Sequence, residues 1–380
     1  MAQLSTVKGD FSLNCYPKVS SSIQQPWDAA DIYLIEQAEL GLFPAIINDQ
    51  WGALSVFSCL QGRSSYSWSD SYCSMQAIRL NLAKLPADQA YAKTLDIGLD
   101  IKLDDGLPAF PTATDSLWIQ CPKSFDQLHW WLLLALEQLG PGIKVSLAGM
   151  AKHIPVKWLK WLEQHNDNYQ QHPIQKKARL IQFEISDRLP PLKREKSYIG
   201  PDQNPISALP GVFSRDHMDI GSRFFISHLG QQAPLKGKVV DLGCGNGLLS
   251  IACLQLNSDK NIELLLCDDS SLALKAAKEN IDSRGSFNAH YYHTDALLNV
   301  PGPVDTILCN PPFHTGNRIS TAAAERMFKQ GRKILNPQGQ LLVVANRHLG
   351  YKPLLKKDFA NITTLASDSK FVIYRCTNPK

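Results

Sequence analysis

The second half of the chain alternates short apolar runs with segments in which apolar residues recur every three or four positions. Residues 236–256 predict an apolar strand, a glycine turn and a helix, and residues 262–281 repeat the order strand, acidic turn, helix. Further apolar strands are predicted within 304–313, 339–349 and 370–376. This alternation is typical of a doubly wound α/β domain, in which ligands bind beyond the carboxyl ends of the strands.

The first half of the chain repeats this pattern more weakly. Four of its segments match segments of the second half in the same order, at an offset of about 190–200 residues: 45–57, 66–82, 116–125 and 142–153. The matches align Gly52 with Gly247, Asp70 with Asp269, Asn81 with Asn280, Pro122 with Pro311 and Gly142 with Gly339. Four matches in one order indicate a duplicated domain. Two unrelated α/β domains with chance matches are the alternative.

A segment rich in proline, serine and charge separates the two halves. Residues 186–213 show no convincing periodicity, and we place the domain boundary near residues 186–205. A length of 380 residues also favours two domains over one. We therefore predict a first domain at 1–190, a linker at 191–205 and a second domain at 206–380.

Composition narrows the class of protein. The chain is 44% hydrophobic and 19% charged, and no apolar run approaches the roughly 18 residues that a membrane helix needs. The N-terminal residues lack the continuous apolar core of a secretory signal. None of the nine cysteines lies in a Cys-x-x-Cys pair. We therefore expect reduced thiols in a cytoplasmic protein that has no membrane partner and no metal site.

Positive charge is concentrated in the middle of the chain. The net charge is +4, but residues 1–140 carry 8 Lys/Arg against 15 Asp/Glu, whereas residues 141–197 carry 11 against 5. Residues 198–380 carry 20 against 15. A local basic surface of this kind suits a polyanion. A solvated helix face followed by a charged linker is the alternative.

The glycine turn of the second half follows a strand that ends in an acid. Asp241 is followed by Gly243, Gly245 and Gly247, and glycines allow close approach of the backbone to a ligand. The dinucleotide fingerprint would require glycine at 248, where the chain has Leu248, and no Gly-Lys-Ser/Thr of a phosphate loop is present. The acid would repel a pyrophosphate but could hold a cationic amino group, directly or through water. A tight structural turn is the alternative.

The next two strands also end in acids. Asp268 and Asp269 follow about 25 residues later, where a carboxylate can accept hydrogen bonds from both ribose hydroxyls. Asp295 is placed to accept a hydrogen bond from an adenine amino group. Together these acids describe an adenosine with a cationic amino-acid tail and no phosphates. We therefore predict S-adenosylmethionine as the cofactor.

The fourth strand of the second half ends in Asn310, Pro311, Pro312 and Phe313. An exocyclic amine of a nucleobase is a poor nucleophile because its lone pair is delocalised into the ring. Hydrogen bonds to the side-chain carbonyl of Asn310 and the backbone carbonyl of Pro311 would localise that pair. The prolines keep the turn rigid and Phe313 can stack on the base. We predict these four residues to be catalytic, acting on a base that is flipped out or single-stranded; a strand terminator is the alternative.

The first half lacks most of these groups. It keeps Gly52 but has neither of the other two glycines nor a counterpart of the strand-end acid Asp241, and Cys121 aligns with Asn310. We infer that the N-terminal copy keeps the fold and has lost the cofactor site.

These residues resemble the Asn-Pro-Pro-(Phe/Tyr) amine methyltransferases of class I. Within that class, residues 212–229, 239–247, 309–314 and 345–351 look like the bacterial ribosomal RNA guanine-N2 methyltransferases with tandem domains. Segments 26–35, 47–55, 69–81 and 175–181 look like the large-subunit type rather than the shorter small-subunit type. The resemblance covers nearly the whole chain. It implies two tandem class I methyltransferase-like (Rossmann-like) doubly wound domains, the N-terminal one degenerate.

The resemblance also implies roles for further residues. Phe213, Asp219 and Gly221 match the segment that folds over the cofactor in these enzymes, and Asn310 borders the cofactor as well as the substrate. Related sequences often have a single acid at the second strand end; we favour Asp268 for the ribose, with Asp269 as an alternative. The degenerate domain is implied to help bind RNA. Our candidates for RNA contacts are Lys176, Lys177, Arg179, His314, Arg347 and His348; for His314, capping of the turn is an equal alternative.

The function predicted is methylation of N2 of one guanine in large-subunit (23S) ribosomal RNA by a monomer. The same reaction on small-subunit (16S) RNA is one alternative, and adenine N6 or a protein glutamine amide are more distant ones. A non-catalytic RNA-binding assembly factor is an alternative from another class. Such a factor would be expected to lose Asp241, the glycines and Asn310, as the first half has done.

Overall fold

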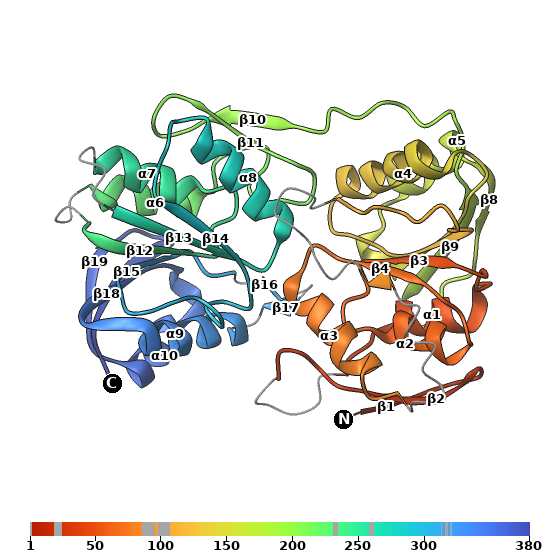
Figure 1. The fold of residues 1–380 in the computed structure, drawn as a ribbon, viewed down its shortest axis with the longest axis horizontal. Helices are drawn as coiled ribbons and strands as arrows, with labels where there is room; N and C mark the ends of the chain where they lie inside the picture. The colour runs from red at the N-terminus through yellow and green to blue at the C-terminus, as the bar shows by residue number, and fades with distance from the viewer. Residues whose placement is uncertain are drawn as a thin grey trace. The chain divides into compact units, whose positions relative to one another are not determined.

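The computed structural model describes residues 2–18, 25–85, 96–97, 107–230, 235–257, 262–312, 314–315, 318–319 and 321–380, and of the three two-residue segments it describes the backbone alone. The chain divides into two compact units, Met1–Arg194 and Glu195–Lys380. Each unit contains a seven-stranded, mostly parallel sheet (Figure 1).

The N-terminal unit starts with a hairpin, β1 (Ala2–Thr6) and β2 (Gly9–Leu13), that precedes the sheet. The strands of its sheet lie in the order β5-β4-β3-β6-β7-β9-β8, and β9 and β8 run antiparallel to their neighbours. Their bounds are β3 Pro44–Ile47, β4 Tyr66–Trp68, β5 Asp96–Ile97, β6 Ser116–Gln120, β7 Lys144–Met150, β8 Asp167–Gln171 and β9 Ala178–Glu184.

Helices cover both faces of this sheet. Figure 1 shows α1, α2 and α3 on one face and α4 and α5 on the other. Their bounds are α1 Ala29–Gln37, α2 Ala53–Leu60, α3 Tyr72–Leu82, α4 Phe125–Leu139 and α5 Val156–His165, with a 3₁₀ turn, η2, at Ala151–His153.

The C-terminal unit has the same architecture. A hairpin of β10 (Lys196–Ile199) and β11 (Pro205–Ala208) precedes a sheet in the order β14-β13-β12-β15-β18-β20-β19. Its strands are β12 Gly237–Leu242, β13 Ile262–Asp268, β14 Ala289–His293, β15 Val304–Cys309, β18 Leu335–Asn346, β19 Phe359–Ser367 and β20 Phe371–Pro379. A further two-stranded sheet is formed by β16 (His314–Thr315) and β17 (Arg318–Ile319).

The helices of this unit are again divided between the two faces, with α6, α7 and α8 on one and α9 and α10 on the other (Figure 1). Their bounds are α6 Ile220–Leu229, α7 Leu248–Leu256, α8 Ser271–Asp282, α9 Ala322–Ile334 and α10 Tyr351–Asp358, with a 3₁₀ turn, η3, at Arg347–Leu349. The strand order, the antiparallel last pair and the preceding hairpin are all shared by the two units, which confirms the tandem α/β fold.

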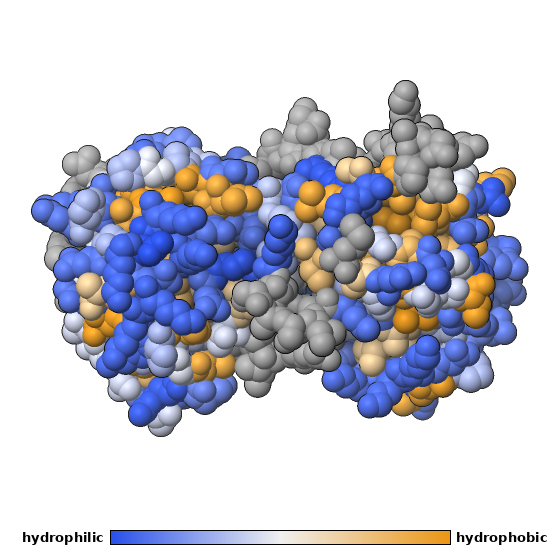
Figure 2. Space-filling view, turned by 90° about the horizontal axis from the view of Figure 1, so that it is seen from below, coloured by the Kyte–Doolittle hydropathy of each residue, from blue (hydrophilic) through white to orange (hydrophobic). Residues whose placement is uncertain are grey.

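The hydrophobic pattern explains why these strands form. All four residues of β3 and all five of β6 are buried, as expected for central parallel strands covered by helices on both faces. In the C-terminal unit β12, β13 and β15 are likewise buried over most of their length. Figure 2 shows mostly hydrophilic residues on the visible face of the C-terminal unit, and hydrophilic residues alternating with larger groups of hydrophobic residues on that of the N-terminal unit.

The predicted linker 191–205 contains regular structure. Its last ten residues include β10 and the first residue of β11, so the segment belongs in part to the hairpin. Four-residue strands with alternating burial leave too little periodicity to stand out from the surrounding prolines and charges. Among the described residues, no helix has the length and apolar character needed to cross a membrane.

Candidate active site

Three predicted site residues lie at one edge of the C-terminal sheet. Asp241 in β12 pairs with Leu266 of β13 and Leu308 of β15, and all three strands are parallel. Their carboxyl ends therefore meet, which brings together Asp241, the terminal residue Asp268 of β13, and Asn310 immediately after β15.

The glycine loop joins β12 to α7 at this edge. Gly243 and Gly245 have φ of 75° and 55°. A Cβ atom on Gly245 would meet no atom within 4 Å, so this glycine borders open space. Gly247 differs, because a Cβ atom there would lie 3.2 Å from the Cα atom of Ala277 in α8. Gly245 therefore leaves room for a ligand, whereas a Cβ atom on Gly243 would lie 3.3 Å from Met327 Cε and Gly247 is required by helix packing.

Asp241 is a buried carboxylate with one unused oxygen. Its Oδ2 accepts hydrogen bonds from the backbone N (3.0 Å) and the Oγ (2.7 Å) of Ser250, whereas the buried Oδ1 has no partner among the described residues. Burial raises the pKa of this carboxyl to about 6, although the bonds from Ser250 oppose the shift. A buried acceptor without a partner fits a donor or cation supplied by a ligand.

Asp268 faces the glycine loop. Its Oδ2 accepts from the backbone N of Gly245 and its Oδ1 from the backbone N of Ser270, both at 2.9 Å. Burial raises the pKa of this carboxyl to about 6, against the effect of those two hydrogen bonds. Asp269 is the next residue, at the start of the turn into α8, so Asp268 is the acid that contacts the loop.

Asp295 lies near this acid but is already paired. The backbone N of Thr294 donates to the backbone O of Asp268 at 3.0 Å, which places the segment at the same edge. Arg326 of α9 donates to Asp295 Oδ1 from Nε (3.3 Å) and from its terminal nitrogen (3.2 Å). A contact from Asp295 to an adenine would therefore come from a carboxylate that Arg326 holds in place.

Two acceptors orient the amide of Asn310. Its Nδ2 donates to Asp219 Oδ2 at 3.1 Å and to Ser222 Oγ at 2.9 Å. Because a carboxylate only accepts hydrogen bonds, the NH₂ group must face Asp219, and Oδ1 is left as the acceptor of the amide. Gly221 lies alongside, where a Cβ atom would be 3.7 Å from Asn310 Oδ1. Asp219 also caps α6 by accepting from the backbone N of Ser222 at 2.8 Å.

The segment before α6 is tied to the glycine loop. Asn246 Nδ2 donates to the backbone O of Ser214 (3.3 Å) and to the hydroxyl of Tyr198 in β10 (3.1 Å). The neighbouring side chain of Phe213 is 58% exposed, an unusual position for a large apolar ring. An exposed ring beside the loop is available to pack on a ligand.

The remaining predicted residues are placed as follows. Pro311 is buried and Pro312 exposed. Phe313 lies outside the described residues, and of His314 only the backbone in β16 is described. Arg347 and His348 are exposed in η3, and Arg347 donates to the backbone O of Asp368 at 2.8 Å. Lys176, Lys177 and Arg179 belong to the N-terminal unit.

The strand register corrects three alignments of the two halves: Cys121 with Asn310, Pro122 with Pro311 and Gly142 with Gly339. In the N-terminal sheet Ile47 pairs with Trp68 and Ile119, as Leu242 pairs with Cys267 and Cys309 in the other. Gln120 therefore corresponds to Asn310, Cys121 to Pro311 and Pro122 to Pro312, one residue away from our alignment. Matching the prolines without a gap caused this error. Leu147 pairs with Ile119 as Val343 pairs with Cys309, so our alignment of Gly142 with Gly339 was also wrong by one residue. Gln120 Nε2 donates to Asp31 Oδ1 at 3.0 Å, so the first unit also has a strand-end amide held by the preceding helix.

The same register shows which cofactor groups the first unit lacks. The buried Ile46 occupies the position of Asp241, and Ser69 occupies that of Asp268. The predicted absence of a strand-end acid equivalent to Asp241 is therefore confirmed. A different acid, Asp49, accepts from the backbone N and Oγ of Ser55, both at 2.8 Å, as Asp241 does from Ser250. Its other oxygen accepts from the backbone N of Gly52 at 2.9 Å, so Asp49 leaves neither oxygen to a ligand.

Several residues of the site were not predicted from sequence. Ser222, Tyr198, Asn246 and Arg326 gave no signal, because their partners lie 31 to 88 residues away along the chain. Asn280 did give a signal in the sequence, because it aligned with Asn81 in the repeat. It donates to the backbone O of Asn246 at 3.0 Å, just before Gly247.

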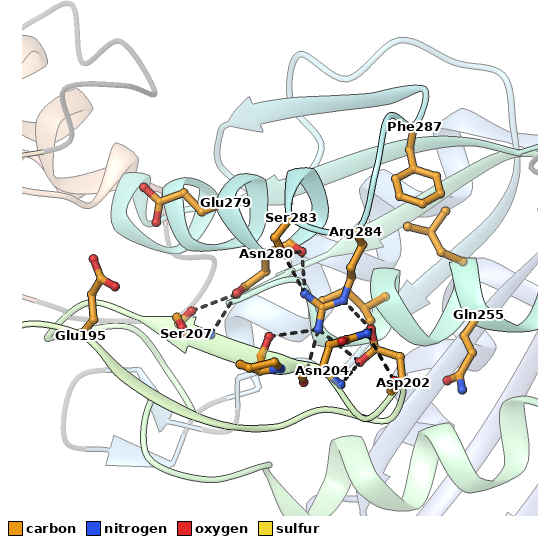
Figure 3. Close-up of a pocket in the computed structure, with 13 residues that line it drawn as sticks. Glu195, Asp202, Asn204, Ser207, Gln255, Glu279, Asn280, Ser283, Arg284 and Phe287 are labelled. Carbon is orange, nitrogen blue, oxygen red and sulfur yellow. Dashed lines mark hydrogen bonds and ion pairs between the residues drawn. The ribbon is translucent and has the colours of Figure 1, made fainter.

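A pocket of about 680 Å³ lies elsewhere in the C-terminal unit. The hairpin and the last turns of α7 and α8 line it, so it is at the amino ends of the strands, away from Asp268 and Asn310. Figure 3 shows Arg284 at its centre, bound to Asp202. The two form an ion pair at 2.6 Å with side chains 9% and 14% exposed. The pocket therefore surrounds a nearly buried ion pair that joins the hairpin to the end of α8.

Comparison with known proteins finds relatives that match both units. A family model described as "Methyltransferase small domain" matches residues 203–375, and one described as "RLMG N-terminal domain" matches residues 1–187. "Ribosomal RNA large subunit methyltransferase G" of Alcanivorax borkumensis is 34% identical, covering 98% of this chain and 96% of that protein. The protein of the same name from Aeromonas salmonicida is 35% identical over 98% of each chain. The chain belongs to the ribosomal RNA large subunit methyltransferase G family.

Membership of the large subunit methyltransferase G family confirms the resemblance and the cofactor, S-adenosylmethionine. The fold of this chain is also that of a solved structure, "T. Thermophilus 16S rRNA N2 G1207 methyltransferase (RsmC) in complex with AdoMet and Guanosine". The TM-score is 0.78 with 18% identity, covering 99% of this chain and 97% of that one. At that identity the likeness supports the tandem fold alone.

Proposed function

We propose that the protein transfers a methyl group from S-adenosylmethionine to the exocyclic N2 amine of one guanine in 23S ribosomal RNA. The orientation of Asn310 is the observation that supports an amine as the group that receives the methyl. Its NH₂ group is held by Asp219 and Ser222, so a hydrogen-bond acceptor, Oδ1, is presented at the edge of the sheet. An amine donor is the complement of that acceptor.

We propose that the cofactor is bound by the groups that the second unit has and the first lacks. Asp241 Oδ1 would accept from the cationic amino group, directly or through water, Asp268 from the ribose and Asp295 from the adenine. Gly245 gives the backbone room to approach, and Gly243 would also border the cofactor. Phe213 would pack on the bound cofactor, and Gly221 keeps α6 close to it.

Asn310 and Pro311 would prepare the substrate amine. The amine donates one N–H to Asn310 Oδ1 and the other to the carbonyl O of Pro311, which localises the nitrogen lone pair and aims it. When bound, S-adenosylmethionine would supply an electrophilic sulfonium methyl group to this lone pair, with the neutral thioether as leaving group. The extra proton on nitrogen then leaves to water. Pro312 stiffens the turn and Phe313 would stack on the base.

Asp219 and Ser222 act as positioning residues in this scheme. They touch neither the base nor the methyl group, but they decide which end of the Asn310 amide faces the substrate. A flipped amide would present two hydrogens to an amine and repel it.

RNA contacts are proposed for Lys176, Lys177, Arg179, His314 and Arg347, since cationic side chains at phosphates give sequence-independent affinity. We further propose that the protein acts as a monomer in the cytoplasm.

The test uses tritiated S-adenosylmethionine and ribosomal RNA from cells that lack the gene. Label in N2-methylguanosine of the 23S species is the expected result. Label in the 16S species, or in another nucleoside, would contradict the proposed target. Intact subunits are tested beside protein-free RNA, and absence of label from both would contradict the proposed activity.

A further inference from the structure

Asn346, at the carboxyl edge of the C-terminal sheet, has an amide that makes no structural bond. It ends β18 and occupies the N-cap of η3, but its side chain makes no capping hydrogen bond. Asparagine is favoured at N-caps because its side chain usually caps. The amides of Asn280 and Asn310 both donate to other residues, whereas the half-buried Asn346 has no side-chain partner in the described part of the chain. Its acceptor and its donors are therefore available to a ligand.

Asn346 lies on the same face of the sheet as Asn310. Leu341, Val343 and Ala345 of β18 pack in one core with residues of α9 and α10. Because side chains alternate along a strand, Asn346 lies on the opposite face, which α6 covers (Figure 1). Asn310 lies on that face too, since its amide is bonded to the start of α6.

The strand register brings these two amides to neighbouring positions. Cys309 of β15 pairs with Val343 of β18. Asn310 follows this pair by one residue and Asn346 follows it by three. A difference of two residues on adjacent parallel strands separates the Cα atoms by roughly 8 Å. One nucleobase can bridge such a gap through hydrogen bonds to both side chains.

One aromatic ring contacts the surroundings of both amides. Phe371 of β20 pairs directly with Asn346. A Cβ atom on Gly221 would lie 3.2 Å from Phe371 Cε1 and 3.7 Å from Asn310 Oδ1, so the ring edge and the amide oxygen border the same glycine. The ring is 7% exposed and stacks with Phe224 of α6, with centroids 6.1 Å apart. Asn346 therefore borders the same packed edge as the predicted catalytic amide.

The first unit differs at both of these positions. In the strand register, Met150 corresponds to Asn346 and Ala178 corresponds to Phe371. Met150 likewise occupies the N-cap of its 3₁₀ turn, η2. A thioether donates no hydrogen bond and accepts only weakly. The free amide and the ring are therefore found in the unit that has the cofactor groups.

The Watson–Crick edge of guanine is complementary to a free amide. Next to the N2 amine, guanine presents the N1–H donor and then the O6 acceptor. The carbonyl of an amide can accept from the first while its NH₂ group donates to the second. Adenine, with its N6 amine in the same place, presents the N1 acceptor and then a C–H group. An amide can therefore make two hydrogen bonds to guanine and one to adenine.

We propose that Asn346 determines the specificity for guanine. While Asn310 receives the N2 amine, the amide of Asn346 accepts from N1–H and donates to O6 of the same base, as in other proteins that read unstacked bases of RNA. This inference rests on the proposed function, methylation of a guanine at N2. Asn346 contacts the base and not the cofactor, so its loss lowers the preference for guanine and leaves cofactor affinity unchanged.

The test compares guanine with 2-aminopurine at the methylated position of a synthetic RNA, after tritium label has located that position. 2-Aminopurine keeps the N2 amine but has an acceptor at N1 and no O6. The ratio of kcat/KM for the two bases is expected to fall roughly 10–100-fold from the wild-type protein to Asn346→Leu, the effect of one bidentate pair. Intrinsic reactivity of the two amines cancels in this comparison. Cofactor affinity and melting temperature should not change, because the amide makes no structural bond.

The matched control is Met150→Leu, at the corresponding position of the first unit, and it should keep the wild-type preference. An unchanged preference in Asn346→Leu, or an equal loss in the control, would overturn the assignment of Asn346. Absence of methyl transfer to guanine by the wild-type protein would contradict the proposed function and this inference with it. Normal transfer with an unchanged preference in Asn346→Leu would contradict the inference alone.

Discussion

The two units are copies of one fold, and only one keeps the groups for chemistry. Both have a glycine of nearly identical conformation at the start of the first crossover helix, Gly52 (φ 85°) and Gly247 (φ 82°). Both have an asparagine, Asn81 or Asn280, that bonds the preceding hairpin and the residue before that glycine. What the copies share belongs to the fold.

What the copies do not share belongs to the site. The differences are Ile46 for Asp241, Ser69 for Asp268 and Gln120 for Asn310. Asp49 sharpens the comparison, because it repeats the contact of Asp241 with a helix serine but has both oxygens occupied. At this position the second unit differs from the first in having a buried carboxylate oxygen, Asp241 Oδ1, with no partner among the described residues.

The largest effect is expected from Asn310→Ala. Loss of the acceptor that activates the amine should lower kcat by roughly 10²–10³-fold and leave cofactor affinity near normal. Gln120→Ala, the matched change in the first unit, should leave kcat unchanged. Single-turnover kinetics and calorimetry check both, and a parallel loss of rate and cofactor affinity in Asn310→Ala would show that its assigned role is wrong.

A smaller effect is expected from Asp268→Asn. Loss of a charged acceptor for the ribose should weaken cofactor binding by roughly 10–100-fold. Asp49→Asn removes a buried carboxylate from the first unit and should leave cofactor affinity unchanged. Equilibrium dialysis compares the two variants; weaker binding in Asp49→Asn would mean that the first unit takes part in the cofactor site.

The shared asparagines should behave alike. Asn280→Ala and Asn81→Ala each leave buried backbone groups without partners, and each should lower the free energy of unfolding by about 1–3 kcal/mol. Denaturant titration measures both. A loss confined to Asn280→Ala would mean that this residue serves the site rather than the fold.

The pH dependence of cofactor binding should follow Asp268. Its pKa of about 6 lies above the ordinary value, so affinity should be full above pH 7 and fall roughly tenfold by pH 5 as the carboxylate is protonated. The same upward shifts at Asp241 and Asp268 stabilise the unliganded unit below about pH 4, and that contribution is lost as the pH rises through 6. Calorimetry from pH 5 to 8 checks this, and an affinity independent of pH would remove Asp268 from the ribose.

The sequence predicted those site residues that lie at the carboxyl ends of parallel strands. Asp241, Asp268 and Asn310 follow apolar runs, and such runs must end at one edge of the sheet. It did not predict Ser222 or Tyr198, because a hydroxyl that meets its partner 48 or 88 residues away leaves no periodic signal. The similarity of Asp49 to Asp241 was not predicted. Asp49 lies six residues before the serine that it binds, whereas Asp241 lies nine residues before its serine.

The central claim is that a duplicated fold contains one cofactor site. Isothermal titration of the full chain with S-adenosylmethionine tests it most directly. We predict one molecule bound per chain, weakened by Asp268→Asn and unaffected by Asp49→Asn. Two molecules per chain, or one that Asp49→Asn abolishes and Asp268→Asn leaves intact, would contradict the division of roles between the two units.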